Sequence, residues 1–335
     1  MAERFEIQAT TGAVHGGRLP SFNAYRLGPG VPVDPRLLTS GSPYIPCFFD
    51  QATSQLVFAE LPPTIDLRQA AFAFVELHRQ ARALLAVSEE ELHAAAARCP
   101  PGLPPIFIFN TSRCGSTLLH RAFNQVPQVS SLGELSFVDD LRRLAEDPSQ
   151  RPRVIELMRS AYRIMMTRYG ETVSFKQLAP CTSIADLHHA AFPTASCLFL
   201  YRNAMDWAAS WQRFREANGI HDVDMQMWLQ AMDAYVSCQT SGTPLTAIRY
   251  EEFNHRPEAI LVALFERLRL PVDAVQAAME VFAEDAQAGT ELARVDGHPN
   301  AYRLTEAQRQ SVTRQLARHE PPWPPAPLVD GTLSV

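Results

Sequence analysis

The chain has 335 residues, 46% of them hydrophobic, and a formal net charge of −6 at pH 7. This hydrophobic content is ample for a core, so the chain is one large domain or one domain with a smaller lobe, and a wholly disordered chain is excluded. The acidic balance argues against general affinity for nucleic acid, although a local basic cleft stays compatible with it, and we expect a small or uncharged binding partner.

Membrane insertion and metal binding are also disfavoured. No apolar run approaches the roughly 20 residues that a membrane span needs, and the opening segment MAERFEIQATTG lacks the apolar core of a signal peptide. The six cysteines are scattered, with no C-x-x-C and no Cys/His pair at metal-ligand spacing. The sequence therefore predicts a soluble, cytoplasmic protein with reduced thiols, no disulfide framework, no membrane partner and no metal.

The first 102 residues differ in character from the rest. Residues 20–43 are rich in Pro, Gly and Ser and predict an extended loop, and residues 44–61 predict a hairpin with its turn at 51–54. Helices are expected over 66–86 and, capped by Ser88 with Glu91 three residues later, over 89–98. This N-terminal extension, 1–102, carries no recognisable chemistry, and we expect it to pack on the core or to cover a cleft.

Strands and helices alternate from residue 105 onward. Strands are expected at 106–109, 172–175, 196–201 and 245–250, and helices at 135–146, 151–168, 182–191, 204–217, 223–240, 257–268, 272–285 and 304–318. This alternation predicts an α/β domain over 103–320, with a mainly parallel sheet flanked by helices, followed by a Pro-rich tail over 321–335. Ligands of such sheets bind at the carboxyl ends of the strands.

The segment TSRCGST, residues 111–117, follows the first of these strands and opens a helix. Unpaired N–H groups and the positive end of the helix dipole make such a turn an anion site. A Walker loop would place a lysine directly after the glycine, but Ser116 follows Gly115, and the basic residue is Arg113. Cys114 is either a thiol whose pKa the anion site lowers or a small side chain in a tight loop, and we favour the second.

Two more groups follow predicted strands. Lys176 is the only lysine among 30 basic residues and ends the strand TVSFK. A GC-rich genome could leave one lysine by chance, but this position favours function. Arg202 ends the next strand and Ser210 lies eight residues later. Each alone would be an ordinary surface cation or a neutral helical serine, but with the anion turn they indicate a ligand with two separated phosphate-like groups.

The sequence from about 105 to 270 resembles the P-loop sulfotransferases that use 3'-phosphoadenosine 5'-phosphosulfate (PAPS). TSRCGSTLL is similar to their 5'-phosphosulfate loop, and RNAMDWAAS to their 3'-phosphate motif, in which an arginine precedes a serine by eight residues. IRYEEFNHRPEAILVALFERLRLP resembles the Tyr-Glu segment and the helix found further along. The motifs occur in the family's order.

The resemblance implies a role for each motif. Arg113, the backbone from Cys114 to Thr117 with Gly115 between them, and the Ser116 and Thr117 hydroxyls would hold the 5'-phosphosulfate. Arg202 and Ser210 would hold the 3'-phosphate. Lys176 and Arg113 would stabilise the charge that develops on the bridging oxygen.

The chain departs from the cytosolic branch of that family at several positions. The branch's catalytic histidine is Leu178 here, and the aromatic residue after the loop threonine is Leu118. Glu134, in SSLGELSF, resembles the Gly-Glu that supplies the base in tyrosylprotein and some carbohydrate sulfotransferases, although a carboxylate at a helix start also suits the dipole. The C-terminal Arg-Lys-Gly motif is missing, and Arg294 is a candidate to reach the site instead.

The resemblance implies transfer of a sulfuryl group from PAPS to a hydroxyl or amine of a small acceptor, with 3',5'-ADP as the product and no metal. Two alternatives remain open at this point: a nucleotide kinase or NTPase of P-loop fold, and a non-catalytic nucleotide-binding module that has lost its base. The sequence predicts neither the acceptor nor the oligomeric state.

Overall fold

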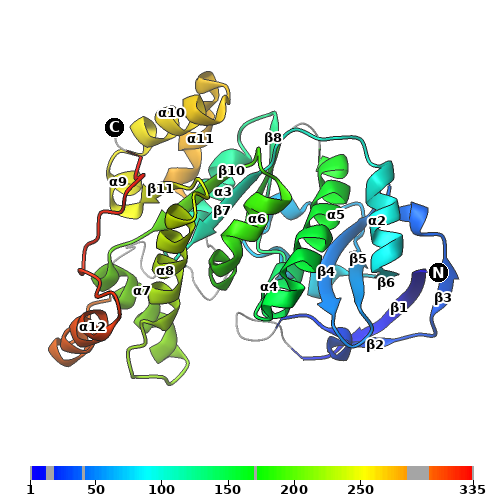
Figure 1. Cartoon of the computed structure of the whole chain (residues 1–335), viewed down its shortest axis with the longest axis horizontal. Helices are drawn as coiled ribbons and strands as arrows, with labels where there is room; N and C mark the ends of the chain where they lie inside the picture. The colour runs from blue at the N-terminus through cyan, green and yellow to red at the C-terminus, as the bar shows by residue number, and fades with distance from the viewer. Residues whose placement is uncertain (1, 13–18, 40–41, 170–171, 285–301, 334–335) are drawn as a thin grey trace. The chain divides into compact units, whose positions relative to one another are not determined.

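The computed structural model describes residues 2–12, 19–39, 42–169, 172–284 and 302–333. The chain forms two compact units, each built from two segments. The first unit joins residues 1–107 to 127–195, and the second joins 108–126 to 196–335. Figure 1 traces the chain through both units.

An antiparallel sheet forms the N-terminal part of the first unit. Its strand order is β2-β1-β6-β5-β4, with β3 also pairing with β1. The bounds are β1 Ala2–Thr10, β2 Tyr25–Leu27, β3 Val31–Val33, β4 Tyr44–Asp50, β5 Gln55–Glu60 and β6 Ala83–Ser88. The turn between β4 and β5 occupies residues 51–54, so the predicted hairpin is confirmed.

Five α-helices lie in the described part of the first unit, and some of them contact this sheet. They are α1 Ala73–Gln80, α2 Glu89–Arg98, α4 Phe137–Leu144, α5 Arg151–Tyr169 and α6 Ala185–Ala191, with 3-10 turns η3 Leu67–Gln69 and η5 Ala179–Ile184. The α2 helix begins with the predicted capping box of Ser88 and Glu91. Figure 1 shows α2 and α5 side by side along β4 and β5.

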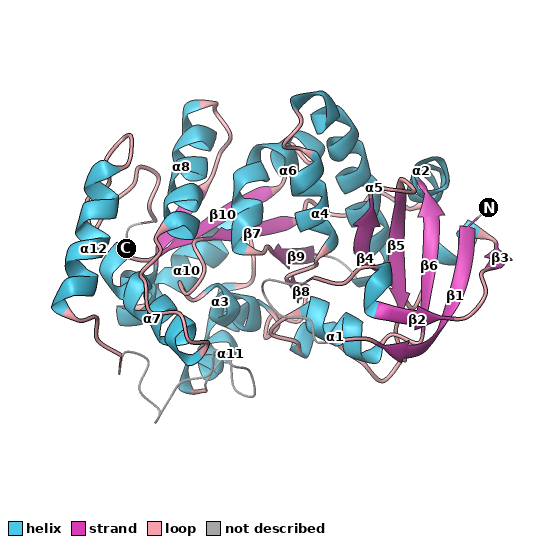
Figure 2. Ribbon diagram, turned by 90° about the horizontal axis from the view of Figure 1, so that it is seen from below, coloured by secondary structure: helices cyan, strands magenta, loops and turns pink. Residues whose placement is uncertain are grey.

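A parallel five-stranded sheet carries the α/β part of the chain, as predicted. Its order is β11-β10-β7-β9-β8, and its strands are β7 Ile106–Asn110, β8 Val129–Gly133, β9 Thr172–Lys176, β10 Ser196–Tyr201 and β11 Thr246–Arg249. The β8–β9 register places Gly133 opposite Lys176, and the β10–β11 register places Tyr201 opposite Arg249. Figure 2 shows these strands in magenta among the helices.

The second unit contains the helix that follows β7 and the C-terminal helices. They are α3 Ser116–Phe123, α7 Ala204–Ala217, α8 Gln226–Thr240, α9 Tyr250–His255, α10 Pro257–Leu268, α11 Val275–Glu280 and α12 Glu306–Arg318. The predicted helices at 204–217 and 257–268 match α7 and α10 residue for residue. The segment predicted as one helix over 272–285 is α11 with a 3-10 turn on either side.

Two N-terminal predictions are wrong in part, and one strand further along the chain was not predicted. Residues 83–86 were expected to be helical, but they lie in β6, where Leu84 and Leu85 are buried between β1 and β5. The expected loop over 20–43 contains the short strands β2 and β3. Strand β8 was not expected, because its serines Ser130 and Ser131 break the apolar run, although both are buried. Tertiary pairing outweighs local propensity in these segments.

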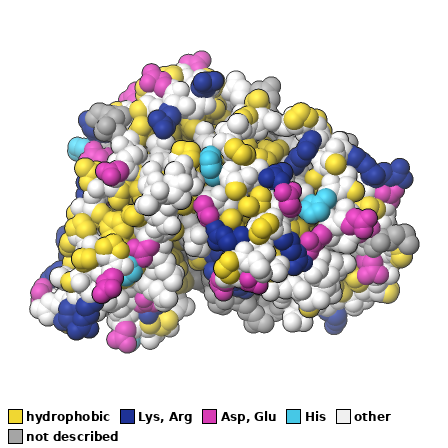
Figure 3. Space-filling model, viewed as in Figure 1, with side chains coloured by type: hydrophobic (Ala, Val, Ile, Leu, Met, Phe, Trp, Pro, Cys, Tyr) yellow, Lys and Arg dark blue, Asp and Glu magenta, His cyan; other side chains and the backbone are white. Residues whose placement is uncertain are grey.

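All six cysteines are buried. Among the described residues, no helix has the length and apolar character required to cross a bilayer. On the face drawn in Figure 3, basic and acidic side chains of the described residues lie intermixed, so neighbouring charges partly offset one another there.

Candidate functional site

The loop between β7 and α3 has an unusual backbone. Ser112 and Arg113 have positive φ angles of 62° and 51°, and Gly115 has a φ of 82°. Left-handed backbone costs a non-glycine residue about 1 to 3 kcal/mol and gathers at functional sites, so its occurrence at two consecutive residues is a reason to look for a ligand. The loop is fixed at its start by a 2.8 Å hydrogen bond from the Ser112 N–H to Asn110 Oδ1.

Two independent features of the structure require a glycine at position 115. Its backbone is left-handed, and a Cβ placed on it would lie 2.9 Å from the Tyr250 ring. The next two residues, Ser116 and Thr117, are buried at the first turn of α3. Cys114 is fully buried, and burial raises the pKa of its thiol. Cys114 is therefore the small buried side chain that the sequence favoured, and not an activated thiol.

The second unit brings the predicted phosphate-binding side chains together. Arg113 Nε donates to Ser210 Oγ at 2.9 Å, and Arg202 Nη1 donates to the Arg113 carbonyl at 3.3 Å. The Arg202 guanidinium lies 4.6 Å from the centroid of the Tyr250 ring, in a cation–π contact. Arg202 is only 4% exposed, so it is a positioned group and not a surface cation.

The electrostatics of this group favour an anionic ligand. Burial, followed by the charges of Arg213 and Arg202, lowers the pKa of Arg113 to about 10. A buried guanidinium repelled by two others carries an energetic penalty that a bound phosphate or sulfate would offset. Arg213 was missed by the sequence analysis. Its spacing of three residues from Ser210 on α7 was the available signal, since residues i and i+3 share a helix face.

Two buried tryptophans hold the loops that carry these arginines. Trp207 Nε1 donates to the Thr111 carbonyl at 2.7 Å, and Trp228 Nε1 donates to the Arg202 carbonyl at 2.9 Å. In the sequence, nothing separates these two tryptophans from ordinary core residues. Because both indoles are fully buried, each bond anchors one motif to a rigid helix.

The first unit holds the other predicted residues, Lys176 and Glu134. The Lys176 ammonium lies 2.8 Å from Glu134 Oε1, and the two side chains are 0% and 15% exposed. They meet because Lys176 is the last residue of β9 and Glu134 directly follows its register partner Gly133 at the end of β8. The Glu134 N–H donates to the Lys176 carbonyl at 2.7 Å, and the backbone of Glu134 is left-handed with a φ of 55°.

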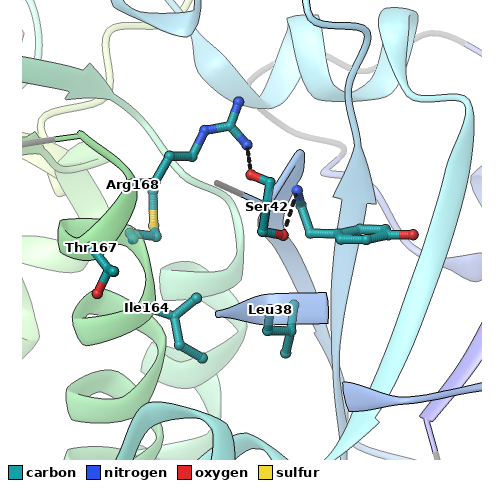
Figure 4. A pocket seen from close by; sticks show the side chains of 7 residues that line it. Leu38, Ser42, Ile164, Thr167 and Arg168 are labelled. Carbon is teal, nitrogen blue, oxygen red and sulfur yellow. Dashed lines mark hydrogen bonds between the residues drawn. The ribbon is translucent and has the colours of Figure 1, made fainter. Parts of the chain in front are cut away.

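One other sequence candidate, Arg294, lies outside the described residues. His188 is fully buried and packs against Phe107 and Tyr162, so it is a core residue. A small pocket of the first unit contains none of the predicted site residues; Figure 4 shows its lining residues Leu38, Ser42, Tyr44, Ile164, Met165, Thr167 and Arg168.

The described residues do not bring three His, Cys, Asp or Glu side chains together in a way that could hold a metal ion. A parallel α/β sheet with a left-handed glycine loop at a helix N-terminus is typical of the P-loop type of fold. A family model described as "Sulfotransferase family" matches residues 104–274, just over half of the chain. The chain therefore belongs to the sulfotransferase family.

The chain is also similar to several solved structures whose names describe sulfotransferases. A sulfotransferase domain from the curacin biosynthetic pathway is 16% identical, with a TM-score of 0.44 and coverage of 65% of this chain and 99% of that one. STF9 of Mycobacterium avium is 12% identical, with a TM-score of 0.44 and coverage of 68% and 79%. Mouse SULT7A1 complexed with PAP is 11% identical, with a TM-score of 0.40 and coverage of 69% and 91%. No curated protein matches the sequence.

Proposed function

We propose that this sulfotransferase uses PAPS and transfers its sulfuryl group to a hydroxyl or amine of a small acceptor. The observation that carries the proposal is the convergence of Arg113, Arg202 and Ser210 around the left-handed loop after β7. These residues are the ones that the family pattern assigns to the two phosphate groups of the nucleotide. Belonging to the family makes a kinase or NTPase the weaker reading.

The nucleotide is proposed to bind through charge-assisted hydrogen bonds. Arg202 and Ser210 take the 3'-phosphate, and the N–H groups and hydroxyls of Ser116 and Thr117 take the 5'-phosphosulfate. Arg113 is desolvated and repelled by neighbouring guanidinium groups, so contact with an anion offsets the cost of keeping it charged. Arg213 adds to the positive potential.

Sulfuryl transfer is proposed to proceed by in-line displacement. The acceptor oxygen or nitrogen forms a bond to sulfur, the bond from sulfur to the bridging oxygen breaks, and 3',5'-ADP leaves with the negative charge. Glu134 takes the acceptor proton as the general base. Lys176 stabilises the charge on the bridging oxygen as a compact cation, together with Arg113.

The remaining assignments are also proposals. Residues 1–102 act as an N-terminal extension that packs on or covers the sulfotransferase domain over 103–320, and 321–335 form a tail. The protein acts in the cytoplasm on a small molecule. Neither nucleic acid nor a membrane is a proposed partner.

Thermal melting with different nucleotides tests the nucleotide assignment. A ligand that binds only the folded protein raises its melting temperature. We expect stabilisation by 3',5'-ADP and none by ATP with Mg²⁺; the reverse pattern would contradict the proposal. A screen of small alcohols, phenols and amines with labelled PAPS then tests turnover. Binding of 3',5'-ADP without transfer to any acceptor would identify a non-catalytic module instead.

A further inference from the structure

Residues 71–74, which lead from η3 into the first turn of α1, contact both members of the Lys176–Glu134 pair. The Lys176 ammonium donates to the Ala71 carbonyl at 3.2 Å and lies 5.3 Å from the centroid of the Phe72 ring. The Phe74 N–H donates to the Glu134 carbonyl at 3.2 Å. In Figure 2, α1 lies beside β8, the strand that leads to Glu134. A segment in which the sequence shows no chemistry therefore surrounds the only lysine of the chain.

These contacts offset part of the free-energy cost of burying the Lys176 ammonium. The Lys176 side chain is 0% exposed, and an ammonium removed from water needs partners that replace its hydration. Glu134 provides the negative charge, the Ala71 carbonyl accepts a hydrogen bond, and the face of the Phe72 ring provides the negative end of its quadrupole. Of these three partners, only Glu134 changes its charge during the proposed reaction.

We propose that Phe72 is a positioning residue that holds the Lys176 ammonium in place while Glu134 takes up the acceptor proton. This inference rests on the proposed function. When the proton reaches Glu134, the carboxylate becomes neutral and its attraction for Lys176 falls. The ring of Phe72 and the carbonyl of Ala71 keep their polarity, so the ammonium stays where the charge of the departing nucleotide develops. The N-terminal segment is thus part of the catalytic machinery and not only a cover.

Two substitutions at Phe72 separate positioning from packing. Phe72→Tyr keeps an aromatic face, whereas Phe72→Leu keeps an apolar side chain but removes the face. We expect the single-turnover rate with saturating PAPS to fall roughly five- to thirtyfold in Phe72→Leu, the range for a desolvated cation–π contact. The rate of Phe72→Tyr should stay within about twofold of the parent, and the affinity for 3',5'-ADP should be unchanged in both. Equal rates for the two variants would overturn the proposal.

Phe22→Leu is a matched control. Phe22 is a partly buried phenylalanine of the same N-terminal extension, and it contacts Phe5 and Phe48. Its substitution removes comparable aromatic packing without touching Lys176, so the transfer rate should not change. A loss as large as that of Phe72→Leu would assign the effect to general packing and overturn the proposal.

A measurement that needs no turnover tests the same contact. Because Lys176 is the only lysine, labelling with isotopic lysine gives one set of side-chain NMR signals. The ring current of Phe72 should shift the Lys176 methylene protons beside the ammonium upfield in the parent and in Phe72→Tyr, and this shift should be lost in Phe72→Leu. Unchanged signals in Phe72→Leu would overturn the proposal. A parent with the shift but no transfer to any acceptor would instead contradict the proposed function.

Discussion

Arg113 Nε donates to Ser210 Oγ at 2.9 Å, so a loop arginine and a helical serine that the family pattern assigns to different phosphate groups of the nucleotide are in direct contact. The two phosphate motifs thus form one hydrogen-bonded group, to which Arg202 adds a bond to the Arg113 carbonyl. Their contributions to binding are consequently coupled, and neighbouring substitutions will not be additive.

Arg202→Ala tests which phosphate Arg202 reads. Removing a charged hydrogen-bonded contact costs about 1.5 to 3 kcal/mol, so 3',5'-ADP should bind more weakly by that amount in calorimetry. Adenosine 5'-phosphosulfate lacks the 3'-phosphate and should be affected little. Arg215→Ala is the control, because Arg215 lies on α7 and pairs with Asp224 at 3.7 Å. Equal losses for the two nucleotides would show that Arg202 does not read the 3'-phosphate.

Glu134→Gln tests the general base. The amide keeps the shape of the carboxylate but does not accept the proton, so turnover should fall on the order of 100-fold or more while nucleotide affinity is retained. The variant should also melt at a lower temperature, because the buried Lys176 ammonium loses the carboxylate that lies 2.8 Å away. Rates are therefore compared at a temperature where both proteins are folded. Near-normal turnover would move the role of the base elsewhere.

Lys176→Arg tests the need for a compact cation. An ammonium approaches a single oxygen as a point charge, whereas a guanidinium is a planar fork that prefers two acceptors and needs more room than this fully buried position offers. The single-turnover rate should fall strongly in Lys176→Arg, and further in Lys176→Ala, while both variants still bind 3',5'-ADP. If Lys176→Arg performs like the parent, the lysine is an accident of composition.

Asp140→Asn tests a pH dependence of stability. Burial raises the pKa of Asp140 to about 7, against the lowering effects of the Phe49 N–H and Arg143. The folded protein therefore holds a proton that the unfolded chain releases near pH 4, so the free energy of unfolding falls as the pH rises from about 4 to 7.

The shift from 3.8 to about 7 corresponds to at most about 4 kcal/mol. Asparagine keeps the acceptor for the Phe49 N–H and removes the charge, so the variant should gain stability over the parent with rising pH in urea unfolding. Asp147→Asn is the contrast, since hydrogen bonds from Ser149 lower the pKa of Asp147. A gain for Asp140→Asn that does not depend on pH would contradict the assignment.

The sequence predicts those elements of the α/β fold for which the apolar periodicity and the capping residues indicate the same boundaries. Helices α7 and α10 begin and end where the pattern indicates, and four of the five parallel strands overlap segments that the pattern predicts as strands. The pattern fails for β6 because Ala83–Ser88 continues the composition of the helix before it, and only pairing with β1 and β5 makes it a strand. Such pairing between distant segments leaves no local trace.

The residues of the candidate site also divide into those that a local sequence pattern can identify and those that it cannot. Motif spacing identified Arg113, Arg202 and Ser210, because the proposed phosphate contacts depend on residues at fixed distances along the chain. Residues that act through packing were not found: Trp228 bonds a backbone carbonyl, and Phe72 lies far from Lys176 in sequence. The residue type of an apolar side chain does not predict which groups it contacts in the folded protein.

The arrangement of the second unit has a consequence for synthesis of the chain. Its loop and α3 lie in 108–126, but the residues that hold them, from Trp207 to Tyr250, follow the whole of 127–195. A ribosome must therefore complete the first unit before the partners of the loop emerge. Contacts between segments so far apart in sequence form slowly. We expect the loop between β7 and α3 to be among the last parts to become ordered in a nascent chain. Truncation before residue 250 should leave this loop unformed.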